Sequence, residues 1–464
     1  MSLQFHNTLT KKVEPFVPLN PDNTSVSLYT CGPTVYNYAH IGNFRAYLFG
    51  DVLKRALQYC GYDVHHVMNI TDIDDKTIRD SQIEKKSLKE FTEFYTEAFF
   101  ADRDALNIIP AREYPRATEY VAEMIAMIEK LIATGHAYKE EDGSVYFKID
   151  SFPNYGTLSH IDLSSLKENA SGRIKKDEYE KDHLQDFALW KAWDSADGEV
   201  FWEPKALLGR DSPFGKGRPG WHLECSAMST NLLGASIDIH TGGVDNIFPH
   251  HENEIAQSEC ATGAHFVNYW MHNEWVMVEG KKMSKSAGNF TTLRTITERS
   301  INPLAFRLLT LMTHYRSPLN FTWEALGGAE TALKRLYSQF LAFEHGGIVN
   351  DQYKAKFTSC IEDDLNTPLA VATMWDLLKD EDIPSVDKRK TLLDFDQILG
   401  LGLSTVKQEH IPEEIRALAN AREQARQEKD WSRSDELRIE IESQGYEIKD
   451  TEKGPVINKN PHKL

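Results

Sequence analysis

The most constraining feature of the sequence is the stretch of residues 30–43, TCGPTVYNYAHIGN, which joins a strand pattern to a helix pattern. Polar and apolar residues alternate before it, in residues 26–29, as in a half-buried β-strand. Gly32 and Pro33 interrupt that strand, and residues 44–57 then have the apolar content of a helix. A strand, a turn and a helix in succession are typical of open parallel sheets, which bind ligands at the carboxyl ends of their strands. The sequence therefore predicts an α/β fold with a site at this turn.

The rest of the chain predicts two α/β segments separated by an insertion, followed by helices. Residues 137–217 contain short alternating strands, a polar irregular stretch and clustered tryptophans, which indicate an inserted unit between two halves of a sheet. The predicted strands are residues 26–30, 62–69, 235–241, 266–269 and 275–278, and the predicted helices are 44–59, 87–106, 114–135 and 249–260. From residue 293 the chain is predicted to be almost entirely helical, and residues 412–464 form a last mixed module.

Length and composition bound the class of protein. At 464 residues the chain is long for one core, and roughly 150 residues per domain suggests about three domains. No run of about 18 apolar residues is present, so we expect no transmembrane helix and no membrane partner. The first residues lack the apolar core of a signal peptide, and we expect a cytoplasmic protein. Five scattered cysteines are too few for a disulfide framework.

The charge is distributed unevenly along the sequence. A net charge of −18 argues against general affinity for nucleic acid, because the field of the whole protein would repel phosphate. Residues 280–317 nevertheless contain seven lysines and arginines and one glutamate. One basic segment on an acidic protein suggests a specific anionic partner.

Four dispersed residues could bind a metal ion. Cys31 ends the first strand, Cys225 lies in WHLECS, and His250 and Glu254 lie in GGVDNIFPHHENE. Because Pro249 favours the first turn of a helix, His250 and Glu254 are expected on one helical face. Thiolate, imidazole and carboxylate ligands together suit zinc. Their position in three separate turns of one α/β domain favours a shared site.

Other interpretations of these residues stay open at this point. A lone buried cysteine usually belongs to a core, and a histidine and glutamate four residues apart are usually solvated. His222, His240 and His251 compete with His250 as ligands. The other cysteines, Cys60, Cys260 and Cys360, lie in predicted helices or helix ends, and we expect them to be structural.

Two further stretches suit phosphate. His40, Gly42 and Asn43 lie where a helix begins, and a helix N-terminus presents free N–H groups and a favourable dipole to an anion. Far downstream, residues 280–289 (GKKMSKSAGN) form a glycine-bounded loop rich in lysine. Lysine is a mobile point charge that suits a phosphoryl group in its transition state. Either stretch alone is weak evidence, but the pair is more specific.

Together these residues resemble the HIGH and KMSKS signatures of class I aminoacyl-tRNA synthetases. Residues 282–286 match the second signature completely, and Asn43 replaces the last histidine of the first. The surrounding sequence resembles the cysteinyl-tRNA synthetase family, in which Asn is common at that position. The resemblance covers nearly the whole chain and includes TCGPTVY, NITDIDDK, GRPGWHLECSAM, GGVDNIFPHHENEIAQ, KMSKSAGN, DWSRSDELR and EIKDT. Residues 194–212 are longer than the family pattern.

The resemblance implies a division into domains. It implies a Rossmann catalytic domain split by a connective peptide, then a stem-contact fold, a helical bundle that binds tRNA and a small domain that reads the anticodon. On this chain the Rossmann halves fall at residues 1–136 and 218–290, the connective peptide at 137–217, the stem-contact fold at 291–328, the bundle at 329–411 and the anticodon domain at 412–464.

The resemblance also implies an activity: ATP-dependent ligation of L-cysteine to tRNA(Cys) through cysteinyl-adenylate. One Zn2+ per chain would bind the substrate thiolate, Mg2+ would accompany ATP, and we expect a monomer. The implied residues are Cys31, Cys225, His250 and Glu254 for zinc, His40, Gly42, Asn43 and Lys285 for ATP, His40, Lys282 and Lys285 for catalysis, and Trp431, Asp435 and Asp450 for the anticodon. We expect Thr71, Trp221 and His240 in the amino-acid pocket, although Trp221 could equally be a core residue.

Two other functions compete with this one. A ligase that joins cysteinyl-adenylate to an aminosugar in mycothiol synthesis shares the catalytic motifs, but it lacks the anticodon-reading end. A non-catalytic RNA-binding paralogue with a structural zinc would not need the complete signature at residues 282–286. Pyrophosphate exchange that depends on cysteine would distinguish the enzymes from the paralogue.

Overall fold

A four-stranded parallel sheet forms the centre of the computed structural model, which describes residues 3–21, 24–161, 186–283, 290–407, 412–451 and 454–459. The strands follow the order β10-β9-β3-β4 and span Val267–Asn273, Ile237–Gly243, Ser25–Thr30 and Asp63–Met68. Strand β3 pairs with β4 on one side and with β9 on the other. The strand order therefore reverses between β3 and β9, and a crevice opens there at the carboxyl ends. The predicted α/β class with a parallel sheet is confirmed.

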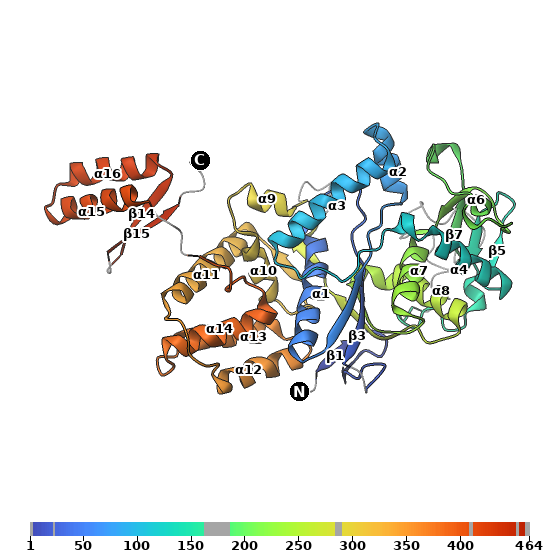
Figure 1. Cartoon of the computed structure of the whole chain (residues 1–464), viewed down its shortest axis with the longest axis horizontal. Helices are drawn as coiled ribbons and strands as arrows, with labels where there is room; N and C mark the ends of the chain where they lie inside the picture. Colours follow the sequence, from blue (N-terminus) through green and yellow to red (C-terminus); the bar gives the residue numbers. More distant parts are fainter. Residues whose placement is uncertain are drawn as a thin grey trace.

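Helix α1 (Ile41–Tyr59) connects β3 to β4 and packs along the sheet (Figure 1). His40 and Asn43 close its first turn reciprocally: the His40 ring accepts from Asn43 N, and the Asn43 side chain accepts from His40 N. This capping box lets the helix begin three residues before the predicted start, because it satisfies backbone groups that the turn leaves unpaired. Phe44, Leu48 and Leu53 are buried against the core.

The insertion forms its own antiparallel sheet in the order β5-β6-β7-β8. Its strands are Ala137–Lys139, Val145–Phe147, Phe187–Ala192 and Gly217–Pro219, with the short helix α6 (Pro204–Leu208) before the last of them. Helices α2 (Asp75–Ile83), α3 (Leu88–Ala105) and α4 (Val121–Ala133) precede the insertion, and α7 (Trp221–Leu233) and α8 (Glu252–Thr262) follow it. Trp190 of β7 is fully buried, so one of the clustered tryptophans belongs to this core.

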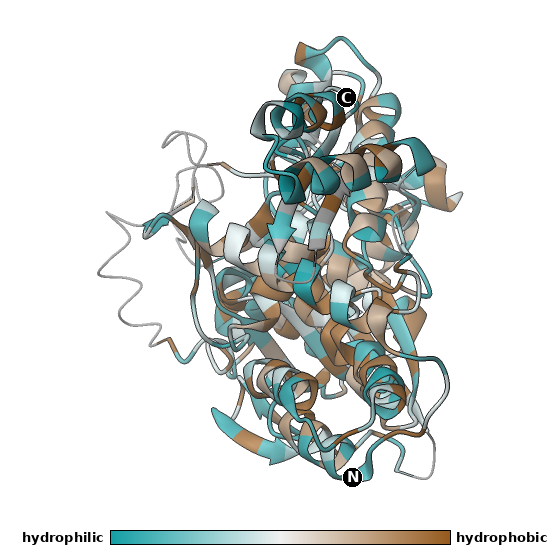
Figure 2. Ribbon diagram, turned by 90° about the vertical axis from the view of Figure 1, so that its left-hand side faces the viewer, coloured by the Kyte–Doolittle hydropathy of each residue, from teal (hydrophilic) through white to brown (hydrophobic). Residues whose placement is uncertain are grey.

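The C-terminal part is mainly helical, as predicted. Its helices are α9 (Leu293–Thr297), α10 (Pro303–Leu311), α11 (Trp323–Ala342), α12 (Asp351–Glu362), α13 (Thr367–Lys379) and α14 (Ser385–Leu399). The last module contains α15 (Glu413–Gln427), α16 (Trp431–Ser443) and the hairpin β14 (Tyr446–Thr451) and β15 (Gly454–Lys459). Figure 1 shows this module at the opposite end of the molecule from the insertion. Many helices mix hydrophilic and hydrophobic residues along their length, as expected of helices with one face on a core (Figure 2).

Several predicted elements were wrong in detail. The expected all-helical segment contains β13 (Leu319–Phe321), which pairs with β11 (Val276–Val278), while β12 (Lys281–Lys282) pairs on the other side of β11. The hairpin β1 (Gln4–Asn7) and β2 (Lys12–Pro15) was not predicted, and strands this short carry little periodicity. The helix expected from residue 114 begins at Val121, because the preceding residues bridge to β4 and the turn after it as extended chain.

None of the helices in the described part of the chain is both long and apolar enough to cross a membrane. The cytoplasmic location and the monomeric state stay predictions.

A buried ion cluster joins α1 to the helical part of the chain. Asp51 of α1 accepts from Arg307 Nη2 of α10 at 2.6 Å and from Arg55 Nε at 2.8 Å. Arg307 also donates to the carbonyl of Leu399, where α14 ends, at 2.6 Å. Burial alone would raise the pKa of Asp51, but the two guanidinium groups hold it below its ordinary value. The part of the chain that holds the parallel sheet is therefore tied to the C-terminal helices by a buried charged contact.

We expect Asp51→Asn to destabilise the protein by about 3–5 kcal/mol, because it leaves two buried cations without their counterion. Urea-induced unfolding at pH 7 measures the effect. Asp102→Asn is the matched control, since burial raises the pKa of Asp102 to about 6 and no cation pairs with it among the described residues. That variant should unfold at the same or a higher urea concentration. Equal midpoints for wild type and Asp51→Asn would contradict the assignment.

Candidate functional site

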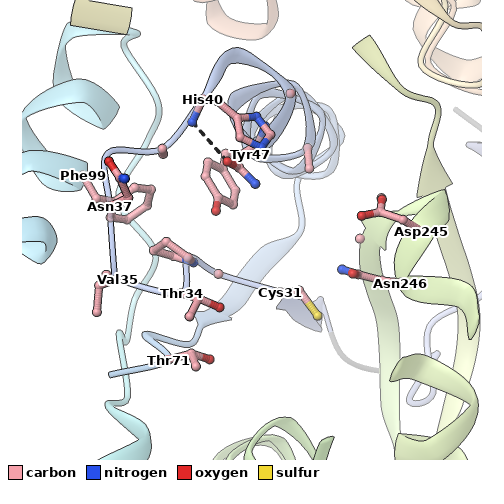
Figure 3. Close-up of a pocket in the computed structure, with 18 of the residues that line it drawn as sticks. Cys31, Thr34, Val35, Asn37, His40, Tyr47, Thr71, Phe99, Asp245 and Asn246 are labelled. Atoms are coloured by element: carbon pink, nitrogen blue, oxygen red, sulfur yellow. Dashed lines mark hydrogen bonds between the residues drawn. The ribbon is translucent and has the colours of Figure 1, made fainter. Parts of the chain in front are cut away.

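A cavity of about 420 Å³ opens at the carboxyl ends of β3 and β9. Eight of the residues predicted from the sequence line it: Cys31, His40, Gly42, Asn43, Thr71, Trp221, Cys225 and His250. Figure 3 shows the loop from Cys31 to His40 along one side of the cavity and Asp245 and Asn246 on the opposite wall. The turn of residues 30–43, with which the sequence analysis began, therefore supplies many of the residues that line the cavity.

The four predicted metal ligands converge beside this cavity. One potential ligand atom from each of Cys31, Cys225, His250 and Glu254 lies within 4.8 Å of the others. Cys31 directly follows β3, and Cys225 lies on the first turns of α7. Two thiols, one imidazole and one carboxylate form a donor set that suits tetrahedral zinc. The arrangement is consistent with a zinc site.

The local structure around His250 differs from the predicted single helix. The Phe248–Pro249 peptide is cis, and a wide turn (Ile247–His251) precedes the regular helix α8, which begins at Glu252. Pro249 therefore precedes the helix instead of forming its first turn. His250 Nε2 still lies 3.1 Å from Glu254 Oε1, because the turn continues directly into α8.

A second, overlapping set of residues could also hold a metal. Cys31, His240, His251 and Glu254 meet the same 4.8 Å limit, so the competing histidines are not excluded by proximity alone. His222 belongs to neither set. Its Nδ1 lies 2.8 Å from Nδ1 of His250, where it can hold the ring of His250 in place.

The contacts of the three remaining histidines favour the first set. His240 Nε2 lies 2.9 Å from Glu254 Oε2, and His251 Nε2 lies 3.2 Å from the Cys31 sulfur. With His222 on His250, each of these contacts orients one ligand of the first set from outside, as the outer partners of metal ligands commonly do. The second set would instead leave the buried thiol of Cys225 unused. Glu254 Oε1 is buried, and its neighbour at 3.1 Å is Nε2 of His250, another member of the first set, so a cation could lie between the two atoms.

The pKa values in the cluster favour ligand forms. A hydrogen bond from Cys225 lowers the pKa of Cys31 despite the opposing effect of burial, and the same contact raises the pKa of Cys225. Burial lowers the pKa of His222 and of His251 well below the ordinary value, so both imidazoles are neutral. One thiol thus ionises readily, and a bound cation would favour loss of the second proton.

The residues predicted to bind phosphate lie at the start of α1. Asn43 N donates to His40 Nδ1 at 3.1 Å, which leaves the ring proton on Nε2 as a donor. A Cβ atom on Gly42 would lie 2.9 Å from the His40 ring and 3.1 Å from the methyl of Met283, so this position requires glycine. Met283 and Phe290 both line the cavity. Of the predicted lysines, Lys282 lies on β12 and Lys285 lies outside the described residues.

The predicted amino-acid pocket is divided by the structure. Thr71 lines the cavity and donates to the buried carboxyl of Glu224 at 2.9 Å. Trp221 also lines the cavity and stacks on His250, with ring centroids 4.3 Å apart, so it is not a core residue. His240 is fully buried beside Glu254 and is absent from the lining. It therefore contacts the candidate ligand Glu254 without reaching the open space.

Asp245 and Asn246 were missed by sequence reasoning. They follow β9 at its carboxyl end and face Cys31 across the cavity (Figure 3). Asp245 and Glu274 are the carboxylates that line the cavity in the described part of the chain. The sequence did contain a pattern that indicates these residues, because GGVDN is a polar turn after a predicted strand, like the turn at residues 70–75.

The three predicted anticodon residues lie in the C-terminal module. Trp431 is 58% exposed, and Asp435 is also exposed. Asp450 accepts from both terminal nitrogens of Arg422, at 2.7 and 3.1 Å, and its pKa is lowered by that contact. Asp450 therefore holds β14 against α15, whereas the other two side chains are available to a partner.

Comparison with known proteins gives a consistent picture. Residues 16–331 match the family model of the class I (C) tRNA synthetase catalytic domain, and residues 408–455 match the cysteinyl-tRNA ligase anticodon binding domain. The cysteine–tRNA ligase of Chlamydia muridarum is 47% identical over 99% of this chain and 100% of its own length. That of Protochlamydia amoebophila is 45% identical over 98% of each chain.

Solved structures agree at the level of the fold. The LeuRS of Agrobacterium radiobacter, in a ternary complex with tRNA and LeuAMS, superposes with a TM-score of 0.59 over 85% of this chain and 86% of its own, at 12% identity. Methionyl-tRNA synthetase of Mycobacterium tuberculosis bound by methionyl-adenylate gives 0.53 over 81% of this chain and 90% of its own, at 14% identity.

Substitution of the ligands separates the two overlapping metal sets. We expect Cys225→Ala to lose its zinc on gel filtration, whereas His251→Ala keeps a zinc ion that is bound about 10–100-fold more weakly. Cys260→Ala, at a half-buried cysteine of α8, is the matched control and should retain the metal. Metal analysis and chelator competition measure both effects. Full zinc content in Cys225→Ala, with loss in His251→Ala, would favour the second set.

Proposed function

The chain belongs to the cysteine–tRNA ligase family of class I aminoacyl-tRNA synthetases. From this we propose that one side of its cavity binds ATP and that another side binds the side chain of cysteine. The enzyme ligates cysteine to tRNA(Cys) at the expense of ATP. The observation that supports this assignment is the loop of residues 31–40, which joins the two sides. Its first residue, Cys31, belongs to the sulfur-rich cluster, and its last, His40, caps the helix at the phosphate side. One short segment therefore faces both substrates.

We assign the first step to the region around His40. The carboxylate oxygen of cysteine attacks the α-phosphorus of ATP, the bond to the bridging oxygen breaks, and pyrophosphate leaves with its Mg2+. No covalent enzyme nucleophile is required, so catalysis consists of positioning and charge stabilisation. His40 Nε2–H, Lys282 and Lys285 donate to the phosphate oxygens, and Gly42 and Asn43 let the nucleotide approach the start of α1.

The cluster on the other side of the cavity supplies specificity. A zinc ion held by Cys31, Cys225, His250 and Glu254 would supply a soft Lewis acid that prefers a thiolate to a hydroxyl. Serine differs from cysteine by one atom, and shape separates such near-isosteres by only about 10²-fold. Trp221 and Thr71 bound the space around the substrate side chain, and His240 orients Glu254.

The ammonium group of the substrate fits the opposite wall. Asp245 lies across from Cys31, and a carboxylate there would pair with the cation while the sulfur points to the cluster. The substrate carboxylate would then point along the loop toward His40.

Transfer completes the reaction. A ribose hydroxyl of the 3′-terminal adenosine attacks the carbonyl carbon of cysteinyl-adenylate, and AMP leaves. We propose residues 1–136 and 218–290 as the catalytic domain, 137–217 as the connective peptide, 291–328 as the stem-contact fold and 329–411 as the tRNA-binding bundle. The module 412–464 would read the anticodon through Trp431 and Asp435. Its presence argues against the aminosugar ligase, and the complete signature at 282–286 argues against a non-catalytic paralogue.

Lys285→Ala and His40→Ala should each lower cysteine-dependent ATP–pyrophosphate exchange about 10²–10³-fold, because each removes a donor to the transferring phosphorus. Lys12→Ala, at an exposed lysine of β2, is the control and should exchange normally. Both active-site variants should retain zinc, since neither residue is a ligand. Exchange by Lys285→Ala within a few-fold of wild type would refute its assignment.

Removal of the metal should abolish the strong preference for cysteine. We expect the chelated protein to bind cysteine and serine with affinities that differ by no more than about 10²-fold, the limit set by shape. Calorimetry on the metal-free and zinc-reloaded protein measures binding independently of catalysis. A large preference that survives without zinc would mean that the protein alone selects the substrate.

A further inference from the structure

A third side of the cavity is formed by Lys76, in the first turn of α2, and by Tyr36 of the loop that follows β3. Lys76 is the one lysine or arginine among the described residues that line the cavity. Its ammonium lies over the Tyr36 ring, 5.2 Å from the centroid. Residues 34–36 are held beside the chain that leads to α2, because Val35 N donates to Thr71 O at 3.1 Å.

Beyond its contact with the Tyr36 ring, Lys76 has no salt bridge within the described structure. Asp74, two residues earlier, is the N-cap of α2, and its carboxylate accepts from the backbone N of Lys76 at 2.6 Å. Asp75 is occupied by Lys191, at 2.8 Å, and by Arg218. No carboxylate of the described chain pairs with Lys76, and its side chain is exposed. A cation held at a cavity rim over an aromatic ring, without a counterion, suits an anionic ligand.

Topology places this pair away from the ATP and cysteine sides. Strand β4, which leads to α2, is the outer strand of the sheet, whereas the crevice lies between β3 and β9. In Figure 3, Asn37, the neighbour of Tyr36 in the sequence, lies on the side of the loop away from Asp245 and Asn246. The lysine-rich signature instead begins on β12, which belongs to a different sheet. Lys76 and Tyr36 are therefore not among the residues assigned to ATP, to the sulfur of cysteine or to its ammonium group, although Thr71 links their loop to the cysteine side of the cavity.

We propose that Lys76 and Tyr36 bind the single-stranded 3′ end of tRNA and position its terminal hydroxyl for transfer. Lys76 Nζ pairs with a phosphodiester near the terminal nucleotide, and the Tyr36 ring packs against that nucleotide. Cationic and aromatic side chains together are the usual means of holding unpaired nucleotides. The inference rests on the proposed function and assigns to these residues the acceptor strand, with no part in activation of cysteine.

The two steps of the reaction should therefore respond differently to Lys76→Met. ATP–pyrophosphate exchange should stay within twofold of wild type, because the adenylate forms on the other two sides of the cavity. Single-turnover transfer from preformed cysteinyl-adenylate to tRNA should fall about 10–100-fold, as for loss of one charge-assisted contact. The plot of log affinity for tRNA against log salt concentration should become less steep, with a slope smaller by about 1, as expected for the loss of one phosphate contact.

A truncated tRNA tests the location of the contact. Wild type and Lys76→Met should bind tRNA lacking its single-stranded 3′ end with equal affinity, whereas intact tRNA should separate them. Lys76→Arg keeps the charge and should retain most of the transfer rate. Lys12→Met, at an exposed lysine remote from the cavity, should behave as wild type in every assay.

Three results would overturn the inference. Transfer by Lys76→Met within twofold of wild type would show that the contact is absent. Equal losses in exchange and transfer would place Lys76 with ATP or cysteine. A difference between wild type and Lys76→Met that persists on truncated tRNA would place the contact elsewhere on the RNA. Failure of the wild-type protein to exchange pyrophosphate with cysteine would instead refute the proposed function itself.

Discussion

The close approach of two backbones at Gly32 is the constraint on which the site depends. A Cβ atom at this position would lie 1.7 Å from the carbonyl oxygen of Asn69, so only glycine allows β3 to end there. Gly32 N donates to Asn69 Oδ1 at 2.8 Å, and Cys31 N donates to Thr241 O at 3.2 Å. The end of β3 is thus pinned to both neighbouring strands. Because Cys31 lies at this pinned point, its sulfur is positioned by the sheet and does not rely on a flexible loop.

The other end of the same loop is held by a different device. The capping box uses His40 twice, since its backbone and its ring both bond to Asn43. The contact from Asn43 N occupies Nδ1 and thereby selects the tautomer with a proton on Nε2. Asn43 contributes a side-chain oxygen that accepts from His40 N. The tautomer is set by the backbone N–H of residue 43, and the Asn43 side chain adds the second hydrogen bond of the capping box.

The sequence was sufficient for the sheet and for the insertion, because each depends on a local pattern, and its motifs named four candidate ligands that the fold brings together. It could not rank His250 against His240 and His251, since these rings lie within 4.8 Å of the same partners only after three distant turns have assembled. The cis peptide before Pro249 and the three-residue strand β13 leave no periodic trace. Asp245 was missed because its place opposite Cys31 in the cavity depends on strand order, which no local pattern encodes.

The distribution of charge shows why a count of basic residues overstates a binding surface. Within the basic segment of residues 280–317, Arg307 is fully buried on Asp51, and Arg316 donates to Asp364 at 2.6 Å. Arg294 pairs with Glu298 at 2.9 Å, and Arg299 stacks on Trp323, 3.7 Å from the ring centroid. Much of the apparent positive charge therefore stabilises the fold. An acidic protein of this kind must attract RNA through a few unpaired cations placed where the phosphates arrive, so position matters more than number.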